Sequence, residues 1–132
     1  MATFTLIEEV NSYTLQRIFR LSRDGKCYYD DSKIAIKNEK TYWSEMGILW
    51  PRLQYVANGE KPFYGEKKYR KIKGNYKYPA FEVKSPNLRL YFFSDTAGLI
   101  LLMVSKKTNQ GEDYNRIELI LKEYYEFKNT LK

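Results

Sequence analysis

The densest chemical signal in this sequence is a run of cations at residues 67–77, KKYRKIKGNYK, which contains no acid. Clustered cations bind phosphates through the release of counterions, and tyrosine rings can stack on unpaired bases. The run therefore predicts an RNA-binding surface, and the alternative is a solvated basic loop whose Tyr69 and Ile72 pack inward. The side chains expected to bind RNA here are Lys68, Arg70, Lys71, Lys73, Tyr76 and Lys77.

Two more cationic features lie at apolar runs. Lys106 and Lys107 directly follow the apolar run at 99–104. The end of a strand can present functional side chains from a rigid backbone, although two lysines there also serve to discourage edge pairing. Arg89 interrupts the apolar run at 88–93 and needs a partner. That partner is solvent, Glu82 on the preceding strand, or a phosphate, which suits the planar donor fork of arginine.

The absent residue types exclude several kinds of chemistry. The chain has no histidine and one cysteine, Cys27, which we expect to be a small packed residue. A Cys/His zinc site, an intramolecular disulfide, a Ser-His-Asp or Cys-His nucleophile and a two-histidine ribonuclease are therefore excluded. Any acid–base chemistry must come from Glu, Asp, Lys or Tyr. The acidic pairs suit helix starts, and no glycine-rich phosphate loop is present, so neither a metal nor a cofactor is expected.

Composition agrees with a single basic domain. The chain has 132 residues, of which 43% are hydrophobic, and its formal charge is 23 − 16 = +7. Together with 13 tyrosines, this charge suits a polyanionic partner, and it equally suits an ordinary basic protein. The longest apolar run is too short to cross a membrane. One thiol and a start that lacks signal-peptide features predict a cytoplasmic location without membrane partners.

Hydrophobic periodicity predicts strands in both halves of the chain. Residues 3–10 and 15–21 alternate apolar and polar side chains and predict one or two N-terminal strands. Runs at 78–84, 88–94 and 98–104 are separated by turn-forming residues and predict a hairpin meander. Because residues 99–104 are apolar throughout, we expect that strand to be buried on both faces.

Helical periodicity appears between and after these strands. Apolar residues at 42, 46, 49, 53 and 56 share one helical face, with candidate N-caps at 30–32 before them. Pro51 interrupts this face, which predicts a kinked helix or two helices. The last element is an amphipathic helix with Asn109 or Asp113 as its candidate N-cap. The order of elements indicates an α+β domain with a small sheet.

The C-terminal half resembles the RelE/ParE toxin superfamily, and within it the HigB-like branch of bacterial type II toxin–antitoxin systems. The resemblance is carried by YRKIKG at 69–74, FEVK at 81–84, LRLYFF at 88–93, LILLMVSKKT at 99–108 and the terminal amphipathic helix, and it covers residues 69–128. It implies one RelE-like domain over residues 1–132 with an N-terminal extension of about 14 residues. In that fold a small, mainly antiparallel sheet packs against two N-terminal helices and one C-terminal helix.

The activity that the resemblance implies is metal-independent cleavage of mRNA by a cytoplasmic endoribonuclease, commonly on the ribosome, with neutralisation by a cognate antitoxin protein. In such enzymes the ribose 2′-hydroxyl attacks the adjacent phosphate while cations stabilise the added charge. Some branches use a histidine that this chain lacks. The alternatives are therefore a noncatalytic RNA- or protein-binding module on the same fold, or a ParE-type inhibitor of a partner enzyme.

The resemblance also implies a site. In this resemblance Arg89 matches a phosphate-binding arginine, and Lys106 and Lys107 match basic residues after the last strand. Lys84 matches a basic residue and Glu82 a glutamate that serves as base in some branches. Tyr114 lies one residue out of phase with a C-terminal tyrosine. We expect the side chains of Arg89, Lys106 and Lys107 to converge on one phosphodiester. The expected catalytic residues are Arg89, Lys107, Lys106, Glu82 and Tyr114, and Lys84 joins the expected RNA-binding residues.

Overall fold

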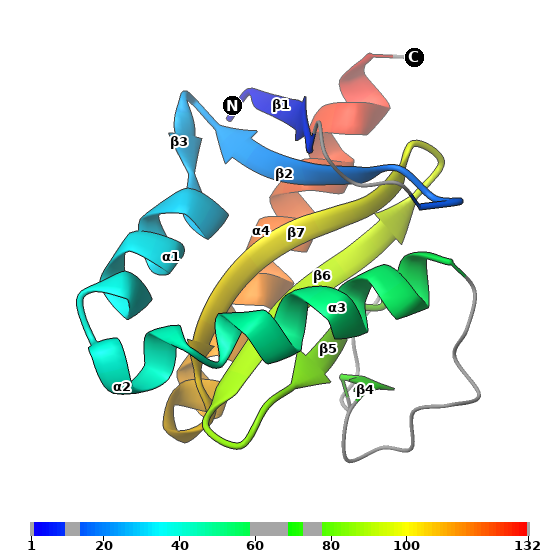
Figure 1. Ribbon diagram of the computed structural model, residues 1–132. Helices are drawn as coiled ribbons and strands as arrows, with labels where there is room; N and C mark the ends of the chain where they lie inside the picture. The colour runs from blue at the N-terminus through cyan, green and yellow to red at the C-terminus, as the bar shows by residue number, and fades with distance from the viewer. Residues whose placement is uncertain (1, 10–13, 59–68, 73–77, 132) are drawn as a thin grey trace.

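The computed structural model describes residues 2–9, 14–58, 69–72 and 78–131, and these build a mixed sheet between two helical layers (Figure 1). The strand order is β1 (Phe4–Glu8), β2 (Ile18–Arg23), β7 (Gly98–Lys106), β6 (Leu88–Asp95), β5 (Phe81–Lys84) and β4 (Tyr69–Lys71), while β3 (Lys26–Cys27) pairs with β2. Every neighbouring pair is antiparallel except β2 and β7, which are parallel.

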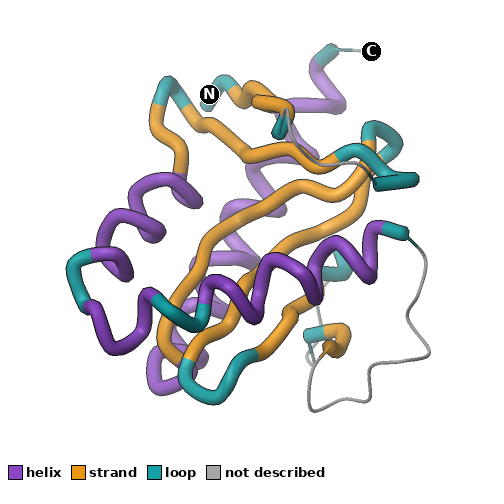
Figure 2. The backbone as a smooth tube through the Cα atoms, in the orientation of Figure 1, coloured by secondary structure: helices purple, strands orange, loops and turns teal. Residues whose placement is uncertain are grey.

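Helices cover both faces of this sheet. The chain between β3 and β4 contains α1 (Tyr28–Lys37), α2 (Lys40–Trp43) and α3 (Met46–Ala57), while α4 (Gln110–Thr130) follows the short 3-10 turn η2 (Lys107–Asn109). Figures 1 and 2 show α3 in front of the sheet and α4 behind it. The predicted α+β class with a mostly antiparallel sheet is confirmed. No helix in the described part of the chain is both long and apolar enough to cross a membrane.

The predicted meander is present as β5, β6 and β7. The side chains of residues 99–104 are all buried, as their apolar character predicted. They divide between two cores, one against α4, with Phe93 and Ile100, and one against α1 and α3, with Phe92 and Leu101. Burial on both faces explains why this strand alternates so little in sequence.

The register between β6 and β7 shifts by one residue in the middle of the hairpin. Phe92 lies opposite Leu101, whereas Tyr91 lies opposite Met103, so that Leu102 is the additional residue of a β-bulge. A one-residue shift moves every later side chain of one strand to the other face of the sheet. The bulge therefore decides which residues at the end of β7 face α4.

The helices differ from prediction in where they begin and break. Pro51 lies inside α3, and the helical chain breaks earlier, between α2 and α3. Proline is tolerated there because both it and Gly47, four residues before it, are exposed, so water can reach the carbonyl that loses its partner. The expected caps at 30–32 are instead in the first turns of α1, whose N-cap is Cys27. Asn109 is confirmed as the N-cap position of α4.

A buried carboxylate ties the helical layer to the β5–β6 turn. Glu45, between α2 and α3, is 8% exposed. It accepts hydrogen bonds from the Ser85 hydroxyl and, at 2.8 Å each, from the backbone N–H and side-chain amide of Asn87. Residues 85–87 are therefore fixed from the α1–α3 side of the sheet.

Candidate functional site

A buried polar cluster lies between the sheet and the start of α4. Glu82 on β5 has no exposed side-chain surface, and its Oε2 lies 3.7 Å from Nε of Arg89 on β6. The Arg89 guanidinium is 14% exposed. Its Nη1 donates hydrogen bonds to the carbonyls of Ser85 and Leu88, each at 2.8 Å. The arginine in the apolar strand is thus paired with Glu82, one of the three partners that its position allowed.

The first turns of α4 complete this cluster. The Tyr114 hydroxyl donates to Oε1 of Glu82 at 2.8 Å, and Nε2 of Gln110 donates to Oε2 of Glu82 at 3.1 Å and to the Tyr114 hydroxyl oxygen at 3.3 Å. We call Glu82, Arg89, Gln110 and Tyr114 the buried polar cluster. It brings together three predicted catalytic residues from β5, β6 and α4, including the tyrosine that is out of phase with the family motif.

Several polar atoms beside the cluster have unmet hydrogen-bonding capacity. The Tyr91 hydroxyl, Oδ2 of Asp113 and Nε of Arg89 are buried and have no hydrogen-bond partner within the described residues. Burial raises the pKa of Tyr91, and the nearby carboxylates of Glu82 and Asp113 raise it further. Burial also raises the pKa of Asp113, against the opposing effect of a Ser105 hydrogen bond. Such atoms indicate room for ordered water or a functional demand on the region.

Lys106 is not part of this cluster, which corrects the expected convergence of Lys106 with Arg89. Arg89 pairs in register with Ser105, and Leu88 pairs with Lys106, so Lys106 faces α1 and Arg89 faces α4. The Lys106 ammonium lies 2.7 Å from a carboxylate oxygen of Glu39. That hydrogen bond raises the pKa of Lys106.

The bulge at Leu102 is the physical reason for this difference. From Asp95 opposite Gly98 to Phe92 opposite Leu101, β6 and β7 pair without a shift. If that pairing continued, Arg89 would lie opposite Val104. Lys106, two residues further on, would then share the face of Arg89. Because of the extra residue, Lys106 instead lies on the opposite face of the sheet from Arg89.

The other predicted cations within the described residues lie on β4, β5 and η2. Lys107 is exposed at the start of η2, and its backbone N–H donates to the Asn87 carbonyl at 2.9 Å. Lys84 pairs in register with Arg89, and Arg70 pairs with Glu82, so β4 and β5 carry basic positions beside the cluster. Lys71 on β4 is exposed. The remaining predicted RNA-binding residues, Lys68, Lys73, Tyr76 and Lys77, lie outside the described residues.

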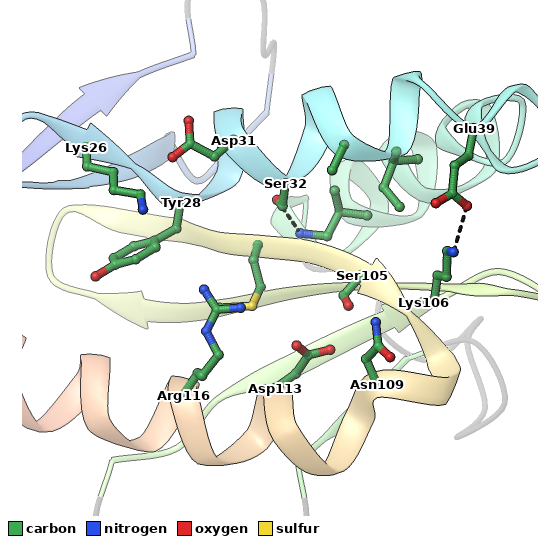
Figure 3. A pocket seen from close by; sticks show the side chains of 14 residues that line it. Lys26, Tyr28, Asp31, Ser32, Glu39, Ser105, Lys106, Asn109, Asp113 and Arg116 are labelled. Atoms are coloured by element: carbon green, nitrogen blue, oxygen red, sulfur yellow. Dashed lines mark hydrogen bonds and ion pairs between the residues drawn. The ribbon is translucent and has the colours of Figure 1, made fainter.

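A concave region of about 390 Å³ lies between α1, β7 and the start of α4 (Figure 3). The parallel pairing of β2 with β7 ends at Leu101. Beyond it, the Val104 backbone N–H donates to the Ser32 hydroxyl of α1 at 3.0 Å. Cations and acids line this groove in equal number, so it has no clear charge preference: Lys26, Lys106, Arg116, Asp31, Glu39 and Asp113.

Sequence reasoning missed Gln110 and Asp113 as parts of the polar region. Gln110 and Tyr114 are four residues apart, so they share one face of α4 and could have been paired from spacing alone. Asp113 was considered only as a cap. The described residues contain no group of His, Cys, Asp or Glu side chains suited to hold a metal ion.

No family model matches this chain, and comparisons with curated proteins and with solved structures found no significant match.

Proposed function

We propose that this chain is a toxin of the RelE/HigB kind, a metal-independent endoribonuclease that acts on mRNA at the ribosome and is neutralised by an antitoxin protein. One observation carries the proposal. Glu82 and Arg89 match positions of the family motif, and Tyr114, more than 20 residues further along the chain, lies one residue out of phase with the family tyrosine. They form one hydrogen-bonded group at the α4 side of the sheet. Lys106, on the other face, has no role in the proposed centre.

Three members of the cluster, Glu82, Arg89 and Tyr114, have a chemical role available to them. The Glu82 carboxylate can accept the proton of a ribose 2′-hydroxyl as that oxygen attacks the adjacent phosphorus. The Arg89 guanidinium can hold the phosphate and stabilise its added negative charge. The Tyr114 hydroxyl can donate a proton to the departing 5′-oxygen, which leaves a 2′,3′-cyclic phosphate and a free 5′-hydroxyl. Lys84 pairs in register with Arg89 and supplies further positive charge beside the cluster. Lys107 is an exposed cation two residues after Ser105, the register partner of Arg89.

The proposal requires the cluster to open, because Glu82 has no exposed side-chain surface. Gln110 and Tyr114 cover it from the first two turns of α4. Further along, Ile117 and Leu121 are buried against the sheet and can keep the rest of the helix in place. Displacement of those first turns by RNA or the ribosome would therefore expose the base.

A second candidate, a noncatalytic RNA- or protein-binding module on the same fold, is favoured by the closed state of the same cluster. Both oxygens of Glu82 accept hydrogen bonds, and the Arg89 guanidinium already donates to two carbonyls. Buried polar groups that are paired in this way commonly fix one packing arrangement. In this candidate the cluster only attaches α4 to the sheet.

Transcript cleavage separates the two candidates. Purified protein is incubated with programmed ribosomes and mRNA, and new 5′ ends are mapped by primer extension. Tyr114→Phe keeps the ring that contacts Tyr91 edge-on and removes only the hydroxyl, so it should lower the cleavage rate by about 10²-fold without unfolding the chain. Glu82→Gln should abolish cleavage, with circular dichroism to confirm that the variant is folded.

Lys106→Ala is the matched control. It removes a cation at the same end of the sheet as Arg89, but on the opposite face. It should leave the cleavage rate within about twofold of wild type. The endoribonuclease proposal is wrong if wild type leaves transcripts intact with and without ribosomes. It is also wrong if Tyr114→Phe cleaves at the wild-type rate. Intact transcripts combined with salt-sensitive RNA binding would support the noncatalytic candidate.

A further inference from the structure

An aromatic groove lies on the helical layer, away from the buried polar cluster. It has a volume of about 430 Å³ and is lined by Tyr29 and Lys33 of α1, Trp43 of α2, and Met46, Gly47 and Trp50 of α3. Figure 1 shows these three helices following one another along the same side of the molecule. Tyr29 is 3% exposed and belongs to the core, whereas both tryptophans are only partly buried against it.

The composition of this groove is that of a protein-binding surface. Trp43 and Trp50 are the only tryptophans of the chain, and both line it. Tryptophan and tyrosine dominate the binding energy of protein interfaces, and methionine adapts to different apolar partners. Two further apolar side chains of the same helices are exposed, Ile34 by 59% and Ile48 by 37%. A concave apolar surface of this size can receive the apolar side chains of a bound segment.

The rim of the groove is positively charged. The ammonium of Lys33 lies 5.8 Å from the centre of the Tyr29 ring, and that of Lys37 lies 5.9 Å from the centre of the Trp43 ring. Lys40, at the start of α2, is exposed. Lys33 and Lys37 of α1 therefore lie close to aromatic rings of the groove, and Lys40 adds an exposed cation at the start of α2.

The acidic residues of the same helical segment contact other residues or line the other groove. Asp30 lies 2.6 Å from Arg20, and Glu39 pairs with Lys106. Glu45 is buried beneath the β5–β6 turn, and Asp31 lines the groove between α1, β7 and α4 (Figure 3). No acid lines the aromatic groove within the described residues.

We propose that the aromatic groove binds an acidic amphipathic helix of a partner protein. In this complex the apolar side chains of the partner helix lie between Trp43 and Trp50, and the carboxylates of that helix face the lysines of the rim. Recognition of an amphipathic helix by an apolar groove is a recurring mode of peptide binding, and opposite charges around it select the partner. This inference does not depend on RNA cleavage, since the groove and the buried polar cluster are on opposite sides of the sheet.

The two tryptophans make the proposal directly measurable, because no other residue contributes indole fluorescence. The full chain is titrated with synthetic helical peptides that lack aromatic residues. One has leucine on one face and glutamate on the other, one has leucine and lysine, and one has serine and glutamate. Only the leucine–glutamate peptide should give a saturable shift of tryptophan emission, and its affinity should fall as salt is added.

Two glycines provide a matched pair of variants. Gly47 and Gly111 are the second residues of α3 and α4, and a Cβ at either position would meet nothing within 4 Å. Gly47→Glu places a carboxylate in the groove and should weaken the leucine–glutamate peptide by about tenfold or more. Gly111→Glu makes the same change outside the groove and should leave the affinity within about twofold.

Four results would overturn the proposal: no emission shift with the leucine–glutamate peptide, equal binding of the leucine–lysine peptide, equal weakening by Gly47→Glu and Gly111→Glu, or self-association. The last is tested by sedimentation velocity without peptide. A concentration-dependent dimer that Gly47→Glu abolishes would assign the groove to a second copy of this chain. Transcript cleavage by Gly47→Glu should match wild type, so failure here is distinct from failure of the proposed nuclease activity.

Discussion

Replacing Glu45 with glutamine tests how the turn beside the buried polar cluster is held. Glu45 accepts three hydrogen bonds from Ser85 and Asn87. The same two residues supply carbonyls that accept hydrogen bonds from the Arg89 guanidinium and from the Lys107 backbone N–H. A carboxylate on one side of the sheet therefore positions two predicted site residues.

The expected cost follows from those contacts. Hydrogen bonds to a charged group contribute about 1.5–3 kcal/mol each, and bonds that share one acceptor group are not additive. Glutamine keeps the shape and one acceptor oxygen but replaces the other with a donor that faces donors. We expect Glu45→Gln to lower the free energy of unfolding by about 2 kcal/mol at pH 7.

The pH dependence has a definite sign. Burial by itself raises the pKa of Glu45, but hydrogen bonds from Ser85, from Asn87 and from the Leu88 backbone outweigh it and hold that pKa below its ordinary value of 4.5. A carboxyl whose pKa is lowered by folding stabilises the native state above its unfolded pKa, and this stabilisation is lost as the pH falls through the folded pKa. The difference between wild type and Glu45→Gln should be complete at pH 7 and shrink as the pH falls below about 4.5.

Urea unfolding followed by circular dichroism, from neutral pH down to about pH 3, measures this difference. Glu118→Gln removes an exposed carboxylate on α4 and should change stability by less than about 0.5 kcal/mol. A Glu45→Gln cost below that value at pH 7 would refute the argument. So would a full cost that persists at the lowest pH.

Three further changes have expected outcomes in the same unfolding assay. Gly98→Ala should cost about 3 kcal/mol or more, because a Cβ there would lie 2.2 Å from the Arg17 carbonyl oxygen and φ is +146°; a cost under about 1 kcal/mol would contradict this. Gly47→Ala should instead stabilise the chain by about 0.5–1 kcal/mol, since it is a helical position with open space. Tyr124→Phe should cost about 1 kcal/mol through loss of its 2.6 Å bond to Asp95, and no loss would show that the bond is replaced by solvent.

Local signals were sufficient for β5, β6, β7 and α4, whereas the short strand β4 was not predicted. Turn residues at 85–87 and 95–98 and the apolar run at 99–104 correctly predicted three antiparallel strands, because hairpin pairing depends on neighbouring residues. Of the two outcomes predicted at Pro51, a kink or a split into two helices, the split does not occur there, because exposure of the proline, a tertiary property, decides whether it is tolerated inside the helix. The helix at 28–37 was anticipated only through its acidic residues, which turned out to lie inside it.

The residue types of the site could be predicted from the sequence, but the face of the sheet on which each side chain lies could not. Glu82 and Arg89 could be paired because they lie on adjacent strands of a short hairpin. Lys106 could not be placed, because an extra residue at Leu102 reverses the face of everything after it, and the apolar run around Leu102 gives no sign of the shift. Both grooves depend on helix–helix and helix–strand packing, which no local pattern determines.

The parallel contact between β2 and β7 has a consequence for the order of assembly during synthesis. Within the described residues, the N-terminal hairpin pairs with the rest of the sheet through residues 99–101, and Phe4 packs against Tyr124 and Phe127 near the end of α4. The first contact cannot form until residue 101 has left the exit tunnel, and the second cannot form until residue 127 has left it. A nascent chain therefore carries an unfinished sheet with exposed apolar side chains, and a factor that binds it at that stage would contact the protein before its fold is complete.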